Sequence, residues 1–224
     1  MANEWVKDVS FDDGDDVIRD SRPPKYQATQ KNKTDRLGIV MRKRGPDGKI
    51  DPEKIGFLVA NTHYHSAVGY VVCTNGRCCE RLGAPKSRIG TIICKYPTDN
   101  DGAVDKKRLG ETEVMMWILN SDKFNDLKRR NKSNPLHLKD IEVTCKDPQY
   151  QKLDIVPSGE AIWPKIEELK AKILKRAEEL EKILPDQLGK KMTTAELIEA
   201  LGDDSDIHEG AVDSVDYSEA LKDL

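Results

Sequence analysis

The chain has 224 residues, 37% of them apolar and 34% charged, so we expect one modest core with much solvated surface. No apolar run approaches the roughly 18 residues of a transmembrane helix, and the mixed, acidic start lacks the pattern of a secretory signal. These features favour a soluble, cytoplasmic protein that has no membrane partner. Five cysteines, three of them clustered, do not predict a secreted disulfide framework but a metal site in a reducing compartment.

The net charge of −3 hides a segregation of charge along the chain. Residues 1–20 hold seven acidic and two basic side chains, and residues 203–224 hold eight acidic side chains and one basic. The body between them, 21–202, has 34 basic and 25 acidic residues, a net charge of +9. This pattern is typical of a nucleic-acid binder whose acidic ends compete with the ligand. The alternative is that acidic ends only keep terminal segments soluble.

In chain order, residues 1–35 predict an acidic arm followed by a polar linker. Regular structure is expected from Leu37, with a strand in "LGIVMRKR" and then a turn at 45–49. The segments "KIGFLVANTHYH" and "VGYVVCT" predict a hairpin. We interpret "TNGRCCERLGAPKS" as a loop with a tight turn at Asn75-Gly76.

Short strands continue through the middle of the chain. They are expected at 88–96, 112–120, 136–145 and 150–157, with a helix at 121–132 whose N-cap is Ser121. Short strands at near-regular spacing, with one helix between them, predict a small closed or partly open β-barrel at 36–160. The fold class is therefore mainly β with C-terminal helices (α+β).

The pattern changes in the C-terminal region, 161–202. Helical spacing of apolar residues predicts an amphipathic helix at 163–184. Packing on the barrel is favoured over a coiled coil because only about three heptads exist, but an oligomer or a docked partner stays open. A second helix is expected at 193–202, with Thr193 and Glu196 spaced as a capping box. Residues 203–224 are expected to form a disordered acidic tail.

Candidate metal ligands lie in a subdomain at about 60–87. They are His63, Cys73, Cys78 and Cys79, with His65 in reserve. On a strand both histidines point to one face, and a hairpin brings that face near Cys73. Because neighbouring extended residues point apart, only one of the adjacent cysteines is expected to bind. A structural zinc ion is the favoured interpretation, and free buried thiols with surface histidines are the alternative.

Two other classes of function stay open beside a binding protein. A metal-dependent nuclease or nicking enzyme would use His63 and His65, but the later tyrosines, Tyr150 and Tyr217, lie in no convincing helix. A zinc-ribbon adaptor would dock partner proteins through 163–184. The sequence has no phosphate-binding loop and no Gly-x-Ser-x-Gly motif, so an enzyme is not the favoured prediction.

Basic and aromatic residues interleave along the expected strands. Single-stranded nucleic acid is held in this way, since cations follow the phosphates and rings stack on bases. The candidate DNA-binding residues are Arg42, Lys43, Arg44, Tyr70, Lys95, Tyr96, Trp117, Arg129, Arg130, Tyr150 and Lys152. Core packing is an alternative for Trp117, and bracing of the metal loop is one for Tyr70. Arg129 and Arg130 end a helix, where cations are favoured in any case.

Several segments, taken in order, carry a resemblance to a known family. They are "FLVANTHYHSAVGYVVCTNGRCCERL", "TIICKYPTDNDG", "VMMWILNSDKFNDLKRR", "IEVTCKDPQYQKLDIVP" and the C-terminal "SEALKDL". Together they resemble the single-stranded DNA-binding proteins of T-even-like bacteriophages. The resemblance implies an OB fold with an inserted zinc subdomain that binds single-stranded DNA without sequence preference. It also implies that the tail at 203–224 recruits replication and recombination proteins and competes with DNA.

The resemblance also implies roles for individual residues. Trp117 and Tyr150 fall where the family has cleft-lining aromatics, and the four ligand candidates fall near its zinc ligands. Three features depart from the family. Cys78 and Cys79 are adjacent instead of separated by two residues, the N-terminus is acidic where the family has a basic cooperativity motif, and the helix at 163–184 has no clear counterpart.

Overall fold

The computed structural model describes residues 23–28, 31–74, 77–99, 102–147 and 152–201. Its strands are β1 (Thr34–Ile39), β2 (Arg42–Arg44), β3 (Ile50–Ile55), β4 (Leu58–His65), β5 (Gly69–Val72), β6 (Lys86–Lys95), β7 (Glu113–Asn120), β8 (Lys139–Cys145) and β9 (Leu153–Glu160). Its helices are α1 (Arg77–Leu82), α2 (Ser121–Ser133), α3 (Glu167–Leu188) and α4 (Thr194–Leu201), with short 3-10 helices η1 (Lys106–Glu111) and η2 (Trp163–Lys165).

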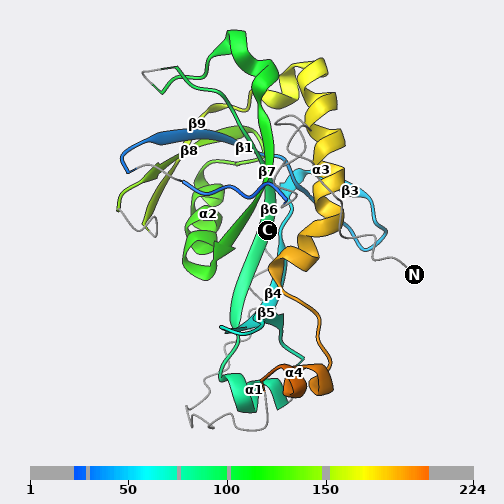
Figure 1. Cartoon of the computed structure of the whole chain (residues 1–224). Coiled ribbons are helices and arrows are strands. Elements are labelled where there is room, and N and C mark those ends of the chain that lie inside the picture. Colours follow the sequence, from blue (N-terminus) through cyan, green and yellow to red (C-terminus); the bar gives the residue numbers. More distant parts are fainter. Residues whose placement is uncertain (1–22, 29–30, 75–76, 100–101, 148–151, 202–224) are drawn as a thin grey trace, which may run out of the picture.

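Seven strands form one antiparallel sheet with the order β5-β4-β6-β1-β8-β9, and β7 pairs with β6 (Figure 1). Strands β4 and β1 share one edge of β6 because β4 pairs with its first half and β1 with its end. The β2–β3 hairpin forms a separate two-stranded sheet. The expected α+β class is confirmed. In the described part of the chain no backbone pairing joins β7 to β9, so the sheet does not close into a barrel.

Alternation along β6 divides the protein into two cores. Ile89 and Ile93 face the core that α2 covers, whereas Ile92 and Cys94 face the core beneath α3. A Cβ atom on Gly90 would lie 2.8 Å from the Leu184 side chain of α3, so this position needs glycine for close packing. Figure 1 shows α2 and α3 on opposite sides of β6 and β7.

The polar segment before β1 is part of the first core, where we expected only a linker. Tyr26 is buried, its hydroxyl donates to Asp35 Oδ2 at 2.9 Å, and its ring meets Trp117 edge-on. The backbone of this segment also pairs with β7, since the Tyr26 amide donates to the Met116 carbonyl at 2.8 Å. One tyrosine among polar residues has no periodic pattern, so this anchoring could not be predicted from the sequence.

The long C-terminal helix packs on the sheet, as favoured from its pattern. Its buried residues are Leu169, Ile173, Ala177, Leu180, Leu184 and Leu188. The helix begins and ends about one turn later than expected, because Trp163 belongs to η2 and the helix continues through Pro185 to Leu188. Packing against β6 and β7 therefore decides where α3 begins and ends, and Pro185 does not end it.

Of the two helix starts predicted from capping residues, one is confirmed and one differs by a residue. The capping box of α4 is confirmed: the Glu196 amide donates to Thr193 Oγ1 at 3.2 Å, and Glu196 Oε2 accepts from the Thr193 amide at 2.7 Å. The N-cap of α2 is Asn120, not Ser121, because the Asn120 side chain accepts from the Lys123 amide. Among the described residues no helix is long and apolar enough to span a membrane.

Candidate metal centre and nucleic-acid interface

The β4–β5 hairpin and α1 bring four potential ligands together. His63 lies on β4, opposite Val71, and Cys73 follows β5. Cys78 and Cys79 lie in α1, where we expected an irregular loop. In an α-helix, neighbouring side chains are only about 100° apart around the axis, so both cysteines can point to one centre. The expectation that only one of the pair joins the cluster is wrong.

Two of three distances in this cluster are close to those around a tetrahedral ion, and the third is shorter. The sulfur of Cys73 lies 3.8 Å from that of Cys78 and 3.3 Å from that of Cys79, and His63 Nε2 lies 3.7 Å from the Cys79 sulfur. Around zinc, tetrahedral bond lengths place two sulfurs about 3.8 Å apart and a sulfur and a nitrogen about 3.5 Å apart. All four ligand atoms lie within 4.8 Å of one another. The cluster can hold a metal ion, and its donor set is compatible with zinc.

Burial and electrostatics agree with this assignment. His63 is 2% exposed, and its Nδ1 has no hydrogen-bond partner among the described residues. Burial, followed by the hydrogen bond and charge of Cys73, raises the pKa of the Cys79 thiol to about 12. Without a cation the Cys79 thiol stays protonated at neutral pH. A divalent cation reverses that preference, so binding would release protons.

The C-terminal segment completes this subdomain. A small apolar cluster contains buried Val71 and Cys78 together with Leu197 of α4, and Met192 packs against it. The backbone of Lys190 also pairs with the edge of β5, since its amide donates to Tyr70 and its carbonyl accepts from Val72. Figure 1 shows α1 and α4 side by side at the end of the molecule beyond β4 and β5. No local pattern in the sequence predicts that these distant segments meet.

His65 is not part of the cluster. Its Nδ1 accepts a hydrogen bond from the Ala67 amide at 3.2 Å, which supports the hairpin turn. Of the two histidines on this face of β4, only His63 belongs to the four-residue group. The reserve ligand expected from the sequence is therefore not needed to complete four donors.

An exposed aromatic pair lies on the other face of the same hairpin. Tyr64 and Tyr70 are opposite each other in the register and are 64% and 42% exposed, with ring centroids 4.9 Å apart. The Arg88 guanidinium lies 3.7 Å from the Tyr70 ring centroid and donates to the Leu188 carbonyl. Tyr64 and Arg88 were not among the functional residues that we predicted from the sequence. Strand alternation could have identified Tyr64, since it lies between two histidines that face the other way.

Two of the expected base-stacking residues are in the core instead. Tyr96 is 1% exposed, and its hydroxyl donates to Asp140 Oδ1 and accepts from the Trp163 amide. Trp117 is 3% exposed and packs against Tyr26. Neither ring can stack on a base in this arrangement, and for Trp117 the core alternative is the correct one. Tyr150 lies outside the described residues.

The expected phosphate contacts have varied surroundings. Arg42 donates to the carbonyls of Ile39, Val40 and Met41 and to that of His137, and Lys95 pairs with Asp35. These two cations therefore support the fold. The remaining candidates are on the surface or at its edge: Arg44 pairs with Glu181, Arg129 and Arg130 pair with Asp126, Lys43 is partly exposed, and Lys152 is exposed.

The described part of the chain is thus an α+β protein with a Cys₃His cluster that can hold a metal ion. Comparison with known proteins adds no relative: no protein-family model matches the chain, and no curated protein or solved structure matches it.

Proposed function

We propose that the chain binds single-stranded DNA without sequence preference, on a surface that includes Tyr64, Tyr70 and Arg88. In this proposal a structural zinc ion at the Cys₃His cluster holds that surface, and the acidic tail at 203–224 competes with DNA and recruits replication and recombination proteins. The observation that carries the proposal is the exposed tyrosine pair beside a cation.

Exposed rings of this kind suit an unpaired strand. Arg88 covers one face of Tyr70, and the Tyr64 ring lies beside Tyr70 at an interplanar angle of 55° and is the more exposed of the two. A base stacked on such a ring contributes about 1–3 kcal/mol, whatever its identity, because every base has a π-face. The net charge of +9 in 21–202 favours a polyanion in the same way.

The order of strand pairing supports an OB-type core with an insertion. Strand β1 pairs with β6 and β8, β6 with β7, and β8 with β9, and α2 lies between β7 and β8. The five strands β1, β6, β7, β8 and β9 pair in the order of an OB fold. In this chain β2 to β5 and α1 are inserted between the first and second of these strands. Such a fold is often only partly closed, which is compatible with the missing pairing of β7 and β9.

One feature moves the proposed surface away from the usual OB-fold position. OB folds bind oligonucleotides over their second and third strands, which correspond here to β6 and β7. Helix α3 covers the outer face of these strands with fully buried residues such as Ile173 and Leu184. The inserted hairpin then offers the aromatic surface that the covered strands cannot.

The metal cluster and the aromatic pair share one strand. His63 and Tyr64 are neighbours on β4 and point to opposite faces, so an ion bound to His63 would also fix the strand that presents Tyr64. Its role would be structural, because four protein ligands fill a tetrahedral site and leave no position for a reactive water. A nuclease built on His63 and His65 is disfavoured for the same reason.

Fluorescence anisotropy of labelled oligo-dT tests the proposal. The unaltered chain should bind at low salt, lose affinity steeply as salt rises, and bind more tightly once 203–224 is deleted. Tyr64→Ala should weaken binding about tenfold, whereas Tyr64→Phe, which keeps the ring, should retain it. Absence of binding at low salt, or equal affinity of the Ala and Phe variants, would contradict the proposal.

A further inference from the structure

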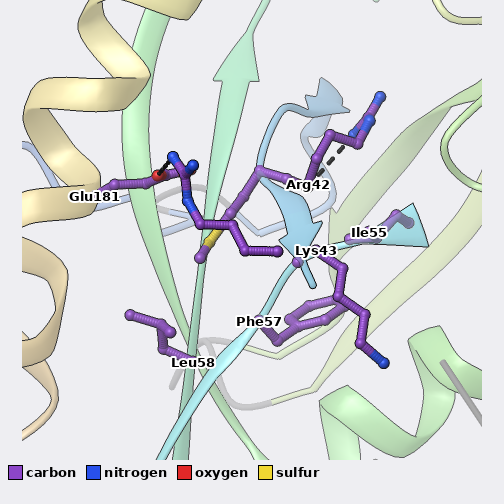
Figure 2. Close-up of a pocket in the computed structure, with 9 residues that line it drawn as sticks. Arg42, Lys43, Ile55, Phe57, Leu58 and Glu181 are labelled. Carbon is purple, nitrogen blue, oxygen red and sulfur yellow. Dashed lines mark hydrogen bonds and ion pairs between the residues drawn. The ribbon is translucent and has the colours of Figure 1, made fainter. Parts of the chain in front are cut away.

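A pocket of about 450 Å³ opens between the β2–β3 hairpin, the start of β4 and α3 (Figure 2). It is lined by Met41, Arg42, Lys43, Arg44, Ile55, Gly56, Phe57, Leu58 and Glu181. Its volume lies in the range of about 300–1,000 Å³ that small-ligand sites occupy. None of the exposed aromatic surface proposed above lines it, so the pocket is a separate feature.

The floor of the pocket is apolar and its backbone is held in place. The apolar side chains are those of Met41, Ile55, Phe57 and Leu58. The Gly56 amide donates to the Met41 carbonyl at 3.0 Å, and the Gly56 carbonyl accepts from Thr91 Oγ1 at 2.9 Å. A Cβ atom on Gly56 would lie 2.5 Å from the Arg42 carbonyl oxygen, so two backbone segments pass each other closely there. The floor therefore exists before any ligand arrives.

Three cations, Arg42, Lys43 and Arg44, line the pocket. Arg42 extends away from α3 (Figure 2) and is committed to four backbone carbonyls, so it holds the bend between β1 and β2. The Arg44 guanidinium is half-exposed and meets Glu181 of α3 at 2.7 Å across the pocket. An exposed pair of this kind is weak, so a phosphate can replace the Glu181 carboxylate.

We infer that this pocket takes one nucleotide of a bound single strand. Its base lies against the apolar floor around Leu58, and its phosphate replaces Glu181 on Arg44. This ligand matches the site because it joins a flat, apolar-faced ring to an anion, as the pocket joins an apolar floor to a cation. The inference rests on the proposed function, and it adds a contact beyond the tyrosine pair.

The position of the pocket fits a strand that also reaches the tyrosines. Leu58 begins β4 and Tyr64 lies near its end, about 20 Å further along the strand. Both belong to the inserted elements, and strand alternation places both side chains on one face of β4, where Leu58 packs at the edge of the core beneath α3. A short single strand can span this distance with a few nucleotides.

Two variants and two oligonucleotides test the inference. Arg44→Gln removes the cation that pairs with Glu181, and Leu58→Phe fills the pocket while keeping its floor apolar. Arg108→Gln is the matched control, because Arg108 is an equally exposed arginine that pairs with Glu111 and does not line the pocket. Each protein is titrated with oligo-dT and with an abasic oligomer of the same length.

Leu58→Phe should weaken oligo-dT binding about tenfold and leave abasic binding unchanged, since only the base enters the pocket. Arg44→Gln should weaken both oligomers several-fold and lower the salt slope by about 0.7, one phosphate contact. Free dTMP should not bind measurably alone. If both variants bind oligo-dT as tightly as Arg108→Gln does, the pocket does not bind a nucleotide, and the proposed function is unaffected. An equal loss of both oligomers on Leu58→Phe, or a tight dTMP complex that does not compete with oligo-dT, would also overturn the inference. If the unaltered chain binds neither oligomer, the inference and the proposed function fail together.

Discussion

The sulfur atoms of Cys73 and Cys79 lie 3.3 Å apart, and His63 Nε2 approaches the same Cys79 sulfur to 3.7 Å. Burial keeps the Cys79 thiol protonated when no cation is present, so the ligands are joined to one centre only when a divalent cation binds and displaces protons. The apolar cluster beside them is small, so the subdomain has little else to hold it together. Its stability should therefore depend on metal.

Histidine substitutions separate a ligand from its neighbour. His63→Ala should lose bound zinc, whereas His65→Ala, two residues along the same strand face, should keep one zinc ion per chain by elemental analysis. The unaltered protein in free zinc at a thousand times its dissociation constant should gain about 4 kcal/mol in free energy of unfolding. A chelator should remove this gain. Equal zinc content in both variants would contradict the proposed ligand set.

Helix α4 should contribute to metal affinity although it supplies no ligand. Leu197 is buried against Cys78 and Val71, so Leu197→Ala should loosen α1 and weaken zinc binding about tenfold in a competition titration with a chromophoric chelator. Leu174→Ala on α3 is the matched control, since Leu174 is 38% exposed and remote from this cluster. Unchanged affinity in the Leu197 variant would show that α4 only rests on the subdomain.

Asp140 should make stability depend on pH. Burial raises the pKa of its carboxyl to about 7, against the ordinary 3.8, although the Ile162 amide and the Tyr96 hydroxyl both donate to it. The folded chain therefore binds a proton that the unfolded chain releases between pH 4 and 7. Stability should fall as pH rises through this window, by about 1.4 kcal/mol for each unit of pKa shift.

Urea denaturation of Asp140→Asn beside the unaltered chain isolates this effect, because other titrating groups cancel in the difference. The variant should gain relative stability steadily from pH 4 to pH 7. A difference that is constant over this range would contradict the raised pKa.

The hydroxyl of Tyr26 should anchor the segment before β1. It donates to Asp35, which also pairs with Lys95, so Tyr26→Phe leaves a buried carboxylate with one partner fewer. We expect a loss of about 1–3 kcal/mol in the free energy of unfolding, measured in urea. The exposed Tyr64→Phe should change stability by less than about 0.5 kcal/mol. Equal effects of the two substitutions would show that the Tyr26 hydroxyl does not stabilise the fold.

Short-range patterns predicted much of this fold correctly. Segments rich in β-branched, aromatic and other apolar residues located the β4–β5 hairpin and the central strands β6 and β7, and the spacing of Thr193 and Glu196 located the cap of α4. These signals depend only on neighbouring residues. The predicted hairpin also brought the face of His63 near Cys73, and the structure confirms that these two residues belong to one cluster.

Contacts between distant segments could not be predicted in this way. Burial of Tyr96 depends on Asp140 and the amide of Trp163, and no local pattern reveals either partner. The two cysteines of α1 converge because six residues form a helix, which is too short to leave a periodic signal. The pairing of Tyr64 with Tyr70 follows from the register of the hairpin, and the sequence predicts the hairpin but not that register.

The joining of residues 189–201 to the hairpin has a consequence for synthesis. Arg88 holds the Leu188 carbonyl although the two residues are 100 positions apart, and Lys190 then extends the edge of β5. A growing chain presents Cys73, Cys78 and Cys79 long before the segment that covers them has been made. These thiols are thus exposed to solvent during translation, and a metal ion that arrives early would protect them until α4 packs against the site.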